Sequence, residues 1–418
     1  MTGPIYPGNE DELVEALKQI IVAIQPRPRS FAAAAVPQAS ANTPDKTYLT
    51  SFIPLLEEPV WPGRLDAYLR PVPTYEITIE MPDGTTEQRF VPDNRPSASC
   101  GPDSQNPDEE SQCHLWNAAE ELEAQAASDA QILAGDYNLG LDEDQRRVYY
   151  PQFDLTTGLP TVPVGLPWIR NYYQRPTDDA GWLDLLEAYG ICDATDPACG
   201  LDPANRDAAI STLDFFHQIK RYQDPATGAD KSFMLGDIFH SDPVVLGNPD
   251  NFRYWTADVG GSGTLPLEDP CATSPNGYRC YFDKQQLRRK MVILGSNSGQ
   301  LHAFDAGIWR GFNGNGCENS TIPGQQILQG DFDGGTGREI FSYVPRISLE
   351  SQNDLRLLGD HDFTIDGRVS HGDVFIDPVH DGMPSVNDRE WRSVLIGGMR
   401  EGGKGYFAID YTQPDTLD

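Results

Sequence analysis

The chain has 418 residues and is strongly acidic, with 63 Asp and Glu against 31 Lys and Arg, a formal net charge of −32 and a pI near 4.4. Such a surface repels a phosphate backbone, which argues against nucleic-acid binding, and it is compatible with divalent cations or with solubility in a saline medium. No apolar run reaches the roughly 18 residues that a transmembrane helix needs, and the residues after Met1 show neither the basic nor the apolar region of a signal peptide.

The first predicted element is an amphipathic helix over residues 9–24. Asn9 is a suitable N-cap, Glu12 follows three residues later, and apolar residues recur at helical spacing from Leu13 to Ile24. Prolines 26 and 28 end this helix. An apolar stripe of this kind needs a packing partner, and no nearby segment supplies one. Residues 1–29 form the first of four predicted regions.

Three further regions follow. Residues 30–92 begin with a low-complexity linker and continue with β segments that Pro and Gly interrupt, over 47–70 and 74–80. Residues 93–230 are polar and irregular with helical patches at 116–133, 182–190 and 207–221, and they predict a mixed helical and loop insertion. Residues 231–418 predict short strands joined by Gly-rich turns, without a long helix.

A strand, Gly-rich turn and strand occur twice in this last region, at 292–306 and at 394–410. A further strand precedes each unit, at 240–247 and at 366–376, and residues 337–346 predict a fourth strand of the first unit. A repeated four-stranded sheet is typical of a β-propeller, which closes with roughly four to eight blades. The predicted fold is therefore mainly β: a partial propeller with quinoprotein-like blades, preceded by the N-terminal helix and linker and the helical insertion.

The turns and strand ends of the two units supply the candidate motif residues. Their glycines fit hairpin turns rather than phosphate cradles, because no helix follows either turn. These residues are predicted to be structural: Gly236, Asp237, His240, Ser241, Pro243, Gly295, Asn297, Gly299, His302, Phe304, Asp305, Asp366, Gly367, Gly397, Gly398, Gly403 and Asp410.

No catalytic or cofactor-binding residue is predicted. His240, Ser241 and Asp242 are consecutive, and adjacent residues of a strand point to opposite faces, so they cannot converge as a hydrolase triad. His302 shares a strand face with Phe304, which favours a buried, hydrogen-bonded histidine over a ligand.

Six of the seven cysteines form pairs that bracket short polar loops, which is the pattern of surface disulfides. The predicted pairs are Cys192 with Cys199, Cys271 with Cys280 and Cys100 with Cys113, leaving Cys317 over. A zinc site would need closer spacing or more histidines than His114 alone.

Asp331 and Asp333 are the metal candidates, because they alternate as calcium-loop carboxylates do. An EF-hand loop would need a ligand where this chain has Gly335 and a Glu where it has Ser342, which favours an acidic turn.

Five segments in register carry a resemblance to a known family: 236–249, 294–306, 335–346, 366–375 and 394–414. Together they resemble the propeller of the type IV pilus tip-associated assembly and adhesin family, the PilC/PilY group. The helix at 9–24, the linker and the spacing of Phe52, Pro54, Trp61, Gly63, Leu65 and Tyr68 resemble the junction between that family's von Willebrand A-like domain and its propeller. On this resemblance residues 1–29 are the tail of a von Willebrand A-like domain, and the chain is an internal fragment, with later blades and an Asp/Asn-rich calcium loop expected beyond Asp418.

The resemblance implies an extracellular protein, at the cell surface or the pilus tip, that acts in pilus biogenesis, twitching motility and adhesion. Its partners would be pilus subunits or minor pilins and a host or abiotic surface. Calcium is implied for the full-length protein, and no cofactor is predicted within this chain. Two alternatives remain: a quinoprotein-type dehydrogenase, whose vicinal cysteine pair this sequence lacks, and a non-adhesive scaffold of outer-membrane assembly.

Overall fold

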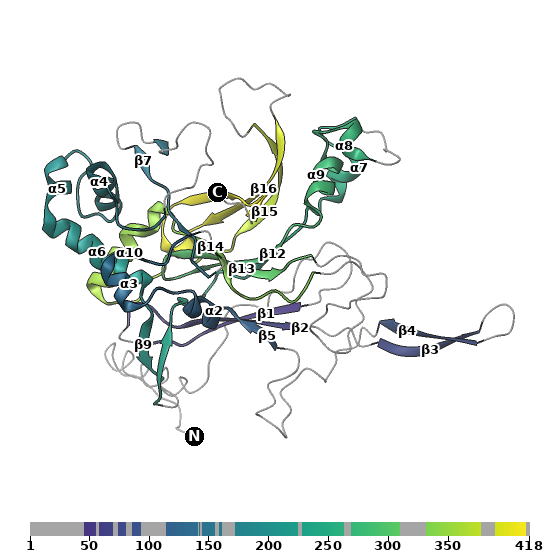
Figure 1. The fold of residues 1–418 in the computed structure, drawn as a ribbon, viewed down its shortest axis with the longest axis horizontal. Coiled ribbons are helices and arrows are strands. Elements are labelled where there is room, and N and C mark those ends of the chain that lie inside the picture. The colour runs from purple at the N-terminus through teal and green to yellow at the C-terminus, as the bar shows by residue number, and fades with distance from the viewer. Residues whose placement is uncertain are drawn as a thin grey trace, which may run out of the picture.

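The fold contains both strands and helices in quantity (Figure 1). It was obtained as a computed structural model that describes residues 46–55, 58–69, 74–80, 86–92, 114–140, 142, 144–154, 159–160, 172–224, 228–262, 269–309, 332–377 and 389–414. The predicted helix at 9–24, Cys100, Cys113, Cys317 and Asp331 lie outside the described residues.

The central sheet is the first predicted unit. Its strands β11 (Val244–Leu246), β12 (Lys290–Ser296), β13 (Gln300–Gly307) and β14 (Glu339–Tyr343) pair in sequence order, each antiparallel to the next. The four-stranded arrangement predicted for this unit is thus confirmed. A fifth strand, β6 (Val148–Tyr149), comes from the region predicted as the insertion and pairs parallel to β14.

Two further sheets flank the central one. The second predicted unit forms a three-stranded antiparallel sheet of β15 (Ser370–Ile376), β16 (Glu390–Gly398) and β17 (Tyr406–Asp410). The predicted β segments near the N-terminus form β1 (Lys46–Phe52) and β2 (Gly63–Leu69), which pair with β5 (His114–Asn117). A separate hairpin of β3 (Thr74–Glu80) and β4 (Thr86–Pro92) projects to the right in Figure 1.

The alternation of side chains along β12 explains why its apolar run is continuous. Met291 and Ile293 pack in one cluster with residues of the β15–β17 sheet, and Val292 and Leu294 pack in another with residues of the β1–β2–β5 sheet. All four side chains are fully buried. Because a fully buried aliphatic side chain contributes roughly 1.5–3 kcal/mol, the central sheet is stabilised from both faces, as a two-sided apolar strand requires.

Helices gather at the left of Figure 1 around a third cluster that includes Trp182, Leu185, Leu213, Phe216 and Leu349. They include α3 (Asp129–Ala134), α4 (Asp179–Ala188), α5 (Pro197–Leu201), α6 (Pro203–His217) and α10 (Arg346–Leu358), while α2 (Ala118–Ala124) packs beside β2. Helices occur in all three patches predicted at 116–133, 182–190 and 207–221, but the first is divided into α2 and α3 and begins with residues of β5, and the third ends at His217 before β9 (Lys220–Gln223). No helix among the described residues has the length and apolar content to span a bilayer.

The prediction that no long helix follows residue 231 is wrong at α10. The buried face of this helix carries Ser348, Gln352 and Asn353 beside Leu349 and Leu355, so polar residues occupy positions where a helix expected from the sequence would show a continuous apolar stripe. The polar side chains are buried because each one forms hydrogen bonds with neighbouring elements.

The insertion between β11 and β12 forms the short helices α7 (Phe252–Ala257), α8 (Pro270–Thr273) and α9 (Tyr278–Gln285). Tyr278 and Tyr281 of α9 pack around Trp391 of β16. The remaining short elements are β7 (Phe153–Asp154), β8 (Leu159–Pro160), β9 (Lys220–Gln223), β10 (Asp230–Phe233) and the 3-10 turn η3 (Arg400–Gly402).

Candidate functional site

The repeated motifs come together at one end of the stacked sheets. We call this region the loop cluster; it comprises residues 236–243, 296–299, 360–367 and 398–405, which are the segments that lead into β11 and β15 and the turns of the two hairpins. Most of the motif residues predicted from the sequence lie in or beside it, and hydrogen bonds accepted by side chains join its four segments.

Asp237 is the first of two buried carboxylates in the loop cluster. Its side chain accepts hydrogen bonds from Asn297 Nδ2 at 2.7 Å and from His361 Nε2 at 3.0 Å, and its main-chain oxygen accepts from the Asn297 N–H at 2.9 Å. The side chain has no solvent exposure. Asp237 therefore links the segment before β11 to the hairpin turn of its own unit and to the segment before β15.

Asp366 has the same role in the second unit. It accepts hydrogen bonds from His240 Nδ1 at 2.7 Å, from the His240 main-chain N–H at 3.2 Å and from Arg400 Nη1 at 3.0 Å. Each carboxylate thus binds one side chain of its own hairpin turn and one histidine ring. Each also stands four residues before a serine, Ser241 or Ser370, a repeat that was visible in the sequence and that the motif analysis missed.

Residues at the end of β1, at the start of β2 and between these strands pack against the loop cluster. The Trp61 ring stacks on His361 at 3.8 Å, and Phe52 contacts Phe239 with ring centroids 5.6 Å apart. A Cβ atom on Gly63 would lie 2.0 Å from the carbonyl oxygen of Gly236, so this close approach of two backbones requires glycine at 63. Of the residues in the junction pattern, Phe52 and Gly63 therefore contact the first unit, and Trp61 contacts the segment that leads into β15.

His240, Ser241 and Asp242 precede β11 rather than alternating along a strand, and the side chains of His240 and Ser241 have separate partners. His240 is directed to Asp366, while Ser241 Oγ accepts a hydrogen bond from the Gly295 N–H at 2.7 Å. The serine hydroxyl and the imidazole therefore serve different neighbours.

His302 belongs to a buried charge network on the central sheet. Its Nδ1 lies 2.7 Å from Glu339 Oε1, its Nε2 lies 3.1 Å from Ser296 Oγ, and Glu339 Oε2 accepts from Arg146 Nε at 2.7 Å. Arg146, on the segment just before β6, also donates to Gln300 Oε1 at 3.1 Å. His302 is thus a hydrogen-bonded core residue, as predicted, whereas nothing in the sequence pointed to Arg146 or Glu339.

The electrostatics of this network are set by burial and by the arginine. Burial alone would raise the pKa of Glu339, but the charge of Arg146 and the hydrogen bonds from His302 and Arg146 hold this pKa at about 2. Burial lowers the pKa of His302, and the hydrogen bond to Glu339 opposes that shift. At neutral pH the network therefore consists of a neutral imidazole between a serine hydroxyl and an ion-paired carboxylate.

Of the two metal candidates, only Asp333 is described. Its Oδ1 accepts hydrogen bonds from the main-chain N–H groups of Ile308 and Gly335, both at 3.0 Å, which is the arrangement of an acidic turn. Within the described ranges, no three His, Cys, Asp or Glu side chains are grouped so that they could hold a metal ion.

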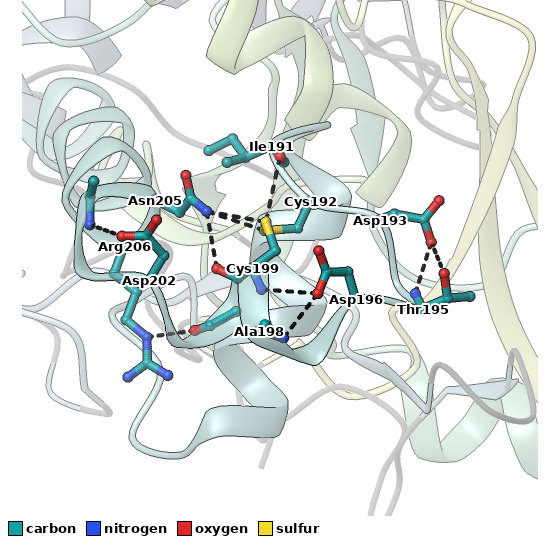
Figure 2. Close-up of a disulfide and its surroundings, with 12 residues drawn as sticks. Ile191, Cys192, Asp193, Thr195, Asp196, Ala198, Cys199, Asp202, Asn205 and Arg206 are labelled. Carbon is teal, nitrogen blue, oxygen red and sulfur yellow. Dashed lines mark hydrogen bonds between the residues drawn. A yellow bond between two sulfur atoms is a disulfide. The ribbon is translucent and has the colours of Figure 1, made fainter.

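Two of the three predicted disulfides are present. Cys192 and Cys199 join the end of α4 to α5, and Cys271 and Cys280 join α8 to α9. Figure 2 shows the first: Asp196 accepts from the Ala198 and Cys199 N–H groups, and Asn205 donates to the Cys199 carbonyl at 3.0 Å. These caps fix the loop on both sides of the disulfide. The third predicted pair lies outside the described residues.

Comparisons with known proteins show which proteins this chain resembles. No protein-family model and no solved structure matches the chain. Among curated proteins it is 28% identical over 188 residues to a type IV pilus biogenesis factor PilY1 homolog of Xylella fastidiosa, which covers 45% of this chain and 11% of that protein. It is 25% identical over 224 residues to the type IV pilus biogenesis factor PilY1 of Pseudomonas aeruginosa, covering 52% of this chain and 15% of that protein.

A second homolog from Xylella fastidiosa is 29% identical over 190 residues, which cover 44% of this chain and 9% of that protein. The chain thus spans only a small part of the length of the curated relatives it matches. These matches confirm the predicted resemblance: the chain is related to type IV pilus biogenesis factor PilY1 proteins.

Proposed function

We propose that this chain is part of an extracellular type IV pilus biogenesis and adhesion protein that acts by binding and assembly, not by catalysis. The observation that carries the proposal is the similarity to PilY1 proteins over 44–52% of the chain. The two disulfides fit an oxidising compartment outside the cytoplasm. Pilus subunits or minor pilins and a host or abiotic surface are the proposed partners, and calcium is proposed for the full-length protein.

We propose further that the three stacked sheets are successive blades of a β-propeller. The central sheet is covered on both faces by a neighbouring sheet. The outer face of the β15–β17 sheet is different, since Ile376, Ile396 and Tyr406 on it are 42%, 53% and 87% exposed. The same face carries the ion-paired Arg392, Glu390 and Asp410, and a further sheet stacked there would bury its apolar side chains as the central sheet buries its own.

The strand order of the second unit supports the same proposal. β13 pairs with both β12 and β14, whereas its counterpart β17 pairs with β16 alone among the described strands. The free edge of β17 is where a fourth strand of the second unit would pair, and an unpaired edge of this kind invites strand addition.

The test is an in-frame deletion of the coding region for 46–414 in the organism that carries it. We expect loss of surface pili by electron microscopy and loss of twitching, both restored by the wild-type gene. Attachment is then measured in a retraction-deficient background that keeps its pili, so that adhesion is separated from assembly. Normal pili together with defective outer-membrane assembly would instead support the non-adhesive scaffold.

A further inference from the structure

An exposed aromatic patch, formed by Phe252 and Trp255, lies on the insertion between β11 and β12, where α7, α8 and α9 project at the upper right of Figure 1. Phe252 is 74% exposed, and its ring centroid lies 6.3 Å from that of the partly exposed Trp255 with 14° between the ring planes. Because the two residues are three positions apart on α7, they lie on the same side of the helix. The two nearly parallel rings therefore face the same direction.

The aromatic patch is held from behind by the buried Arg279. Its guanidinium carbon lies 5.3 Å from the centroid of the Trp255 ring, and its nitrogens donate to the carbonyl oxygens of Trp255 at 2.9 Å and of Thr256 at 2.8 Å. The disulfide between Cys271 and Cys280 ties α8 to α9, the helix that carries Arg279. The indole therefore loses little conformational freedom when a ligand binds, which favours binding.

Polar groups lie beside the aromatic patch on the exposed side of α7. Thr256 follows Phe252 by four positions, and Arg253 precedes Thr256 by three, so these residues are neighbours on the helix surface. The Thr256 hydroxyl donates to the Phe252 carbonyl at 2.8 Å, which leaves its lone pairs available to accept. The exposed guanidinium of Arg253 supplies donors. A ligand at this surface therefore meets aromatic rings, hydrogen-bond donors and an acceptor together.

Area and charge decide which class of ligand this surface fits. One aromatic side chain buries about 150–250 Å², so two of them supply well under the roughly 800 Å² that each partner contributes to a stable protein–protein interface. The formal net charge of −32 repels anionic membranes and anionic polymers. The surface therefore favours a small uncharged ligand that has both an apolar face and hydroxyl groups.

We propose that the aromatic patch, together with Arg253 and Thr256, binds uncharged saccharides whose hydroxyl groups are equatorial. The C–H bonds on one face of such a pyranose ring pack against the electron-rich faces of the aromatic rings. Hydroxyl groups at the edge of the sugar accept from Arg253 and donate to Thr256. For its biological role this inference rests on the adhesion proposed above, but binding is measured on the purified chain, apart from pilus assembly.

The experiment is isothermal titration calorimetry of the full chain with cellohexaose, a chain of β-linked glucose units with equatorial hydroxyl groups. Phe252→Ala should weaken binding by about 10-fold, the factor that corresponds to the loss of an aromatic contact. Phe252→Tyr keeps the ring and should retain the affinity of the wild type. Tyr406→Ala is the matched control, because Tyr406 is 87% exposed but lies on β17, and this variant should bind as the wild type does.

Absence of cellohexaose binding would overturn the proposal, as would equal affinities of the wild type and a Phe252→Ala variant with an unchanged circular dichroism spectrum. Two further measurements address other ligands of the aromatic patch. If Phe252→Ala abolishes binding to phosphatidylcholine vesicles or dimerisation in size-exclusion chromatography, and cellohexaose does not bind, the patch serves a lipid surface or a second copy of the chain. In each of these cases, loss of pili in the deletion strain would still support the pilus function.

Discussion

At the scale of single residues, buried charge decides how the helical region attaches to the central sheet. Arg146 and Glu339 are 1% and 0% exposed in their side chains and are separated by 193 positions in sequence. The desolvation of such a pair is costly, and removing one partner leaves the other charge buried without compensation. We therefore expect the Arg146–Glu339 pair to fix the geometry of this contact while adding little to the net free energy of unfolding.

Arg146→Met should destabilise the chain by about 3–5 kcal/mol, because Glu339 would remain as an uncompensated buried acid. The matched variant Arg146→Met with Glu339→Gln should recover a large part of this loss, since no unpaired charge remains. Urea denaturation followed by tryptophan fluorescence measures both. If the double variant is as unstable as the single one, the contribution of Arg146 is packing rather than charge.

Acid should destabilise the chain through Glu339. Its pKa in the folded protein, about 2, lies below its ordinary value of 4.5, so its contribution is present above pH 4.5 and is lost as the pH falls toward 2. Glu339→Gln should therefore flatten the dependence of unfolding free energy on pH in this window, by up to about 1.4 kcal/mol per pH unit. Equal slopes for variant and wild type between pH 4.5 and 2 would contradict this assignment.

His217 should act at higher pH. It is buried against Tyr137, its Nε2 lies 2.6 Å from the Tyr173 carbonyl oxygen, and burial lowers its pKa from 6.5 to about 3. Because the unfolded chain then binds the proton first, stability declines as the pH falls from 6.5 toward 3. His217→Phe should reduce this slope between pH 6.5 and 4.5, where Glu339 does not yet titrate, and leave the contribution of the other buried histidines such as His302. Thermal unfolding midpoints across that range provide the measurement, and an unchanged slope counts against a neutral buried histidine.

At the scale of elements, α10 holds the hairpin turn of the central sheet. Gln352 donates to the Ser298 carbonyl at 2.8 Å and accepts from the Tyr173 hydroxyl at 2.6 Å, while Ser348 donates to the Gly299 carbonyl at 3.1 Å. Gly299 has φ of +83°, the left-handed conformation that glycine adopts without strain. The turn between β12 and β13, which the sequence predicted, therefore also binds α10, a helix that the sequence did not predict.

Gly299→Ala should destabilise the chain by about 2–4 kcal/mol, combining left-handed strain with a clash. The new Cβ would lie 2.7 Å from Gln352 Nε2, and this side chain is fully buried and hydrogen-bonded, so it cannot move away. Gly359→Ala is the matched control, with φ of +75° and no atom within 4 Å of its Cβ position; it should cost only about 1 kcal/mol. Equal losses in chemical denaturation would show that the contact with Gln352 is unimportant.

At the scale of the whole molecule, substitutions on the outer face of the β15–β17 sheet can test whether a further sheet packs there. Ile396 and Leu395 are neighbours on β16, but Ile396 is 53% exposed on the outer face, whereas Leu395 is fully buried toward the central sheet. The two positions therefore test the two faces of one strand.

In the isolated chain, Leu395→Lys should reduce stability by about 3–5 kcal/mol, because it places a charge in a core position. Ile396→Lys should change it by less than about 0.5 kcal/mol, since the side chain remains in water. In the full-length protein both substitutions should be destabilising if a further sheet covers the outer face. Thermal unfolding of both forms provides the comparison, and a neutral Ile396→Lys in the full-length protein would argue against a covering sheet.

The sequence by itself determined the features that a few consecutive residues encode. The two hairpins, the strands around them, the disulfides that close 7- and 9-residue separations and the helices with an apolar stripe all follow from local turn chemistry and periodicity. The resemblance to the pilus proteins rested on the same short motifs. These motifs do not show which segments contact one another in the folded chain.

Only the tertiary structure decided the long-range contacts. The pairing of β6 with β14, the polar inner face of α10, the Arg146–Glu339 ion pair and the two carboxylates that join the loop cluster link segments far apart in sequence. Polar residues carry no periodic signal for burial, because each is buried only where a particular partner satisfies its hydrogen bonds. The partner comes from the packing of the sheets, and so the position of these residues follows from the assembled fold.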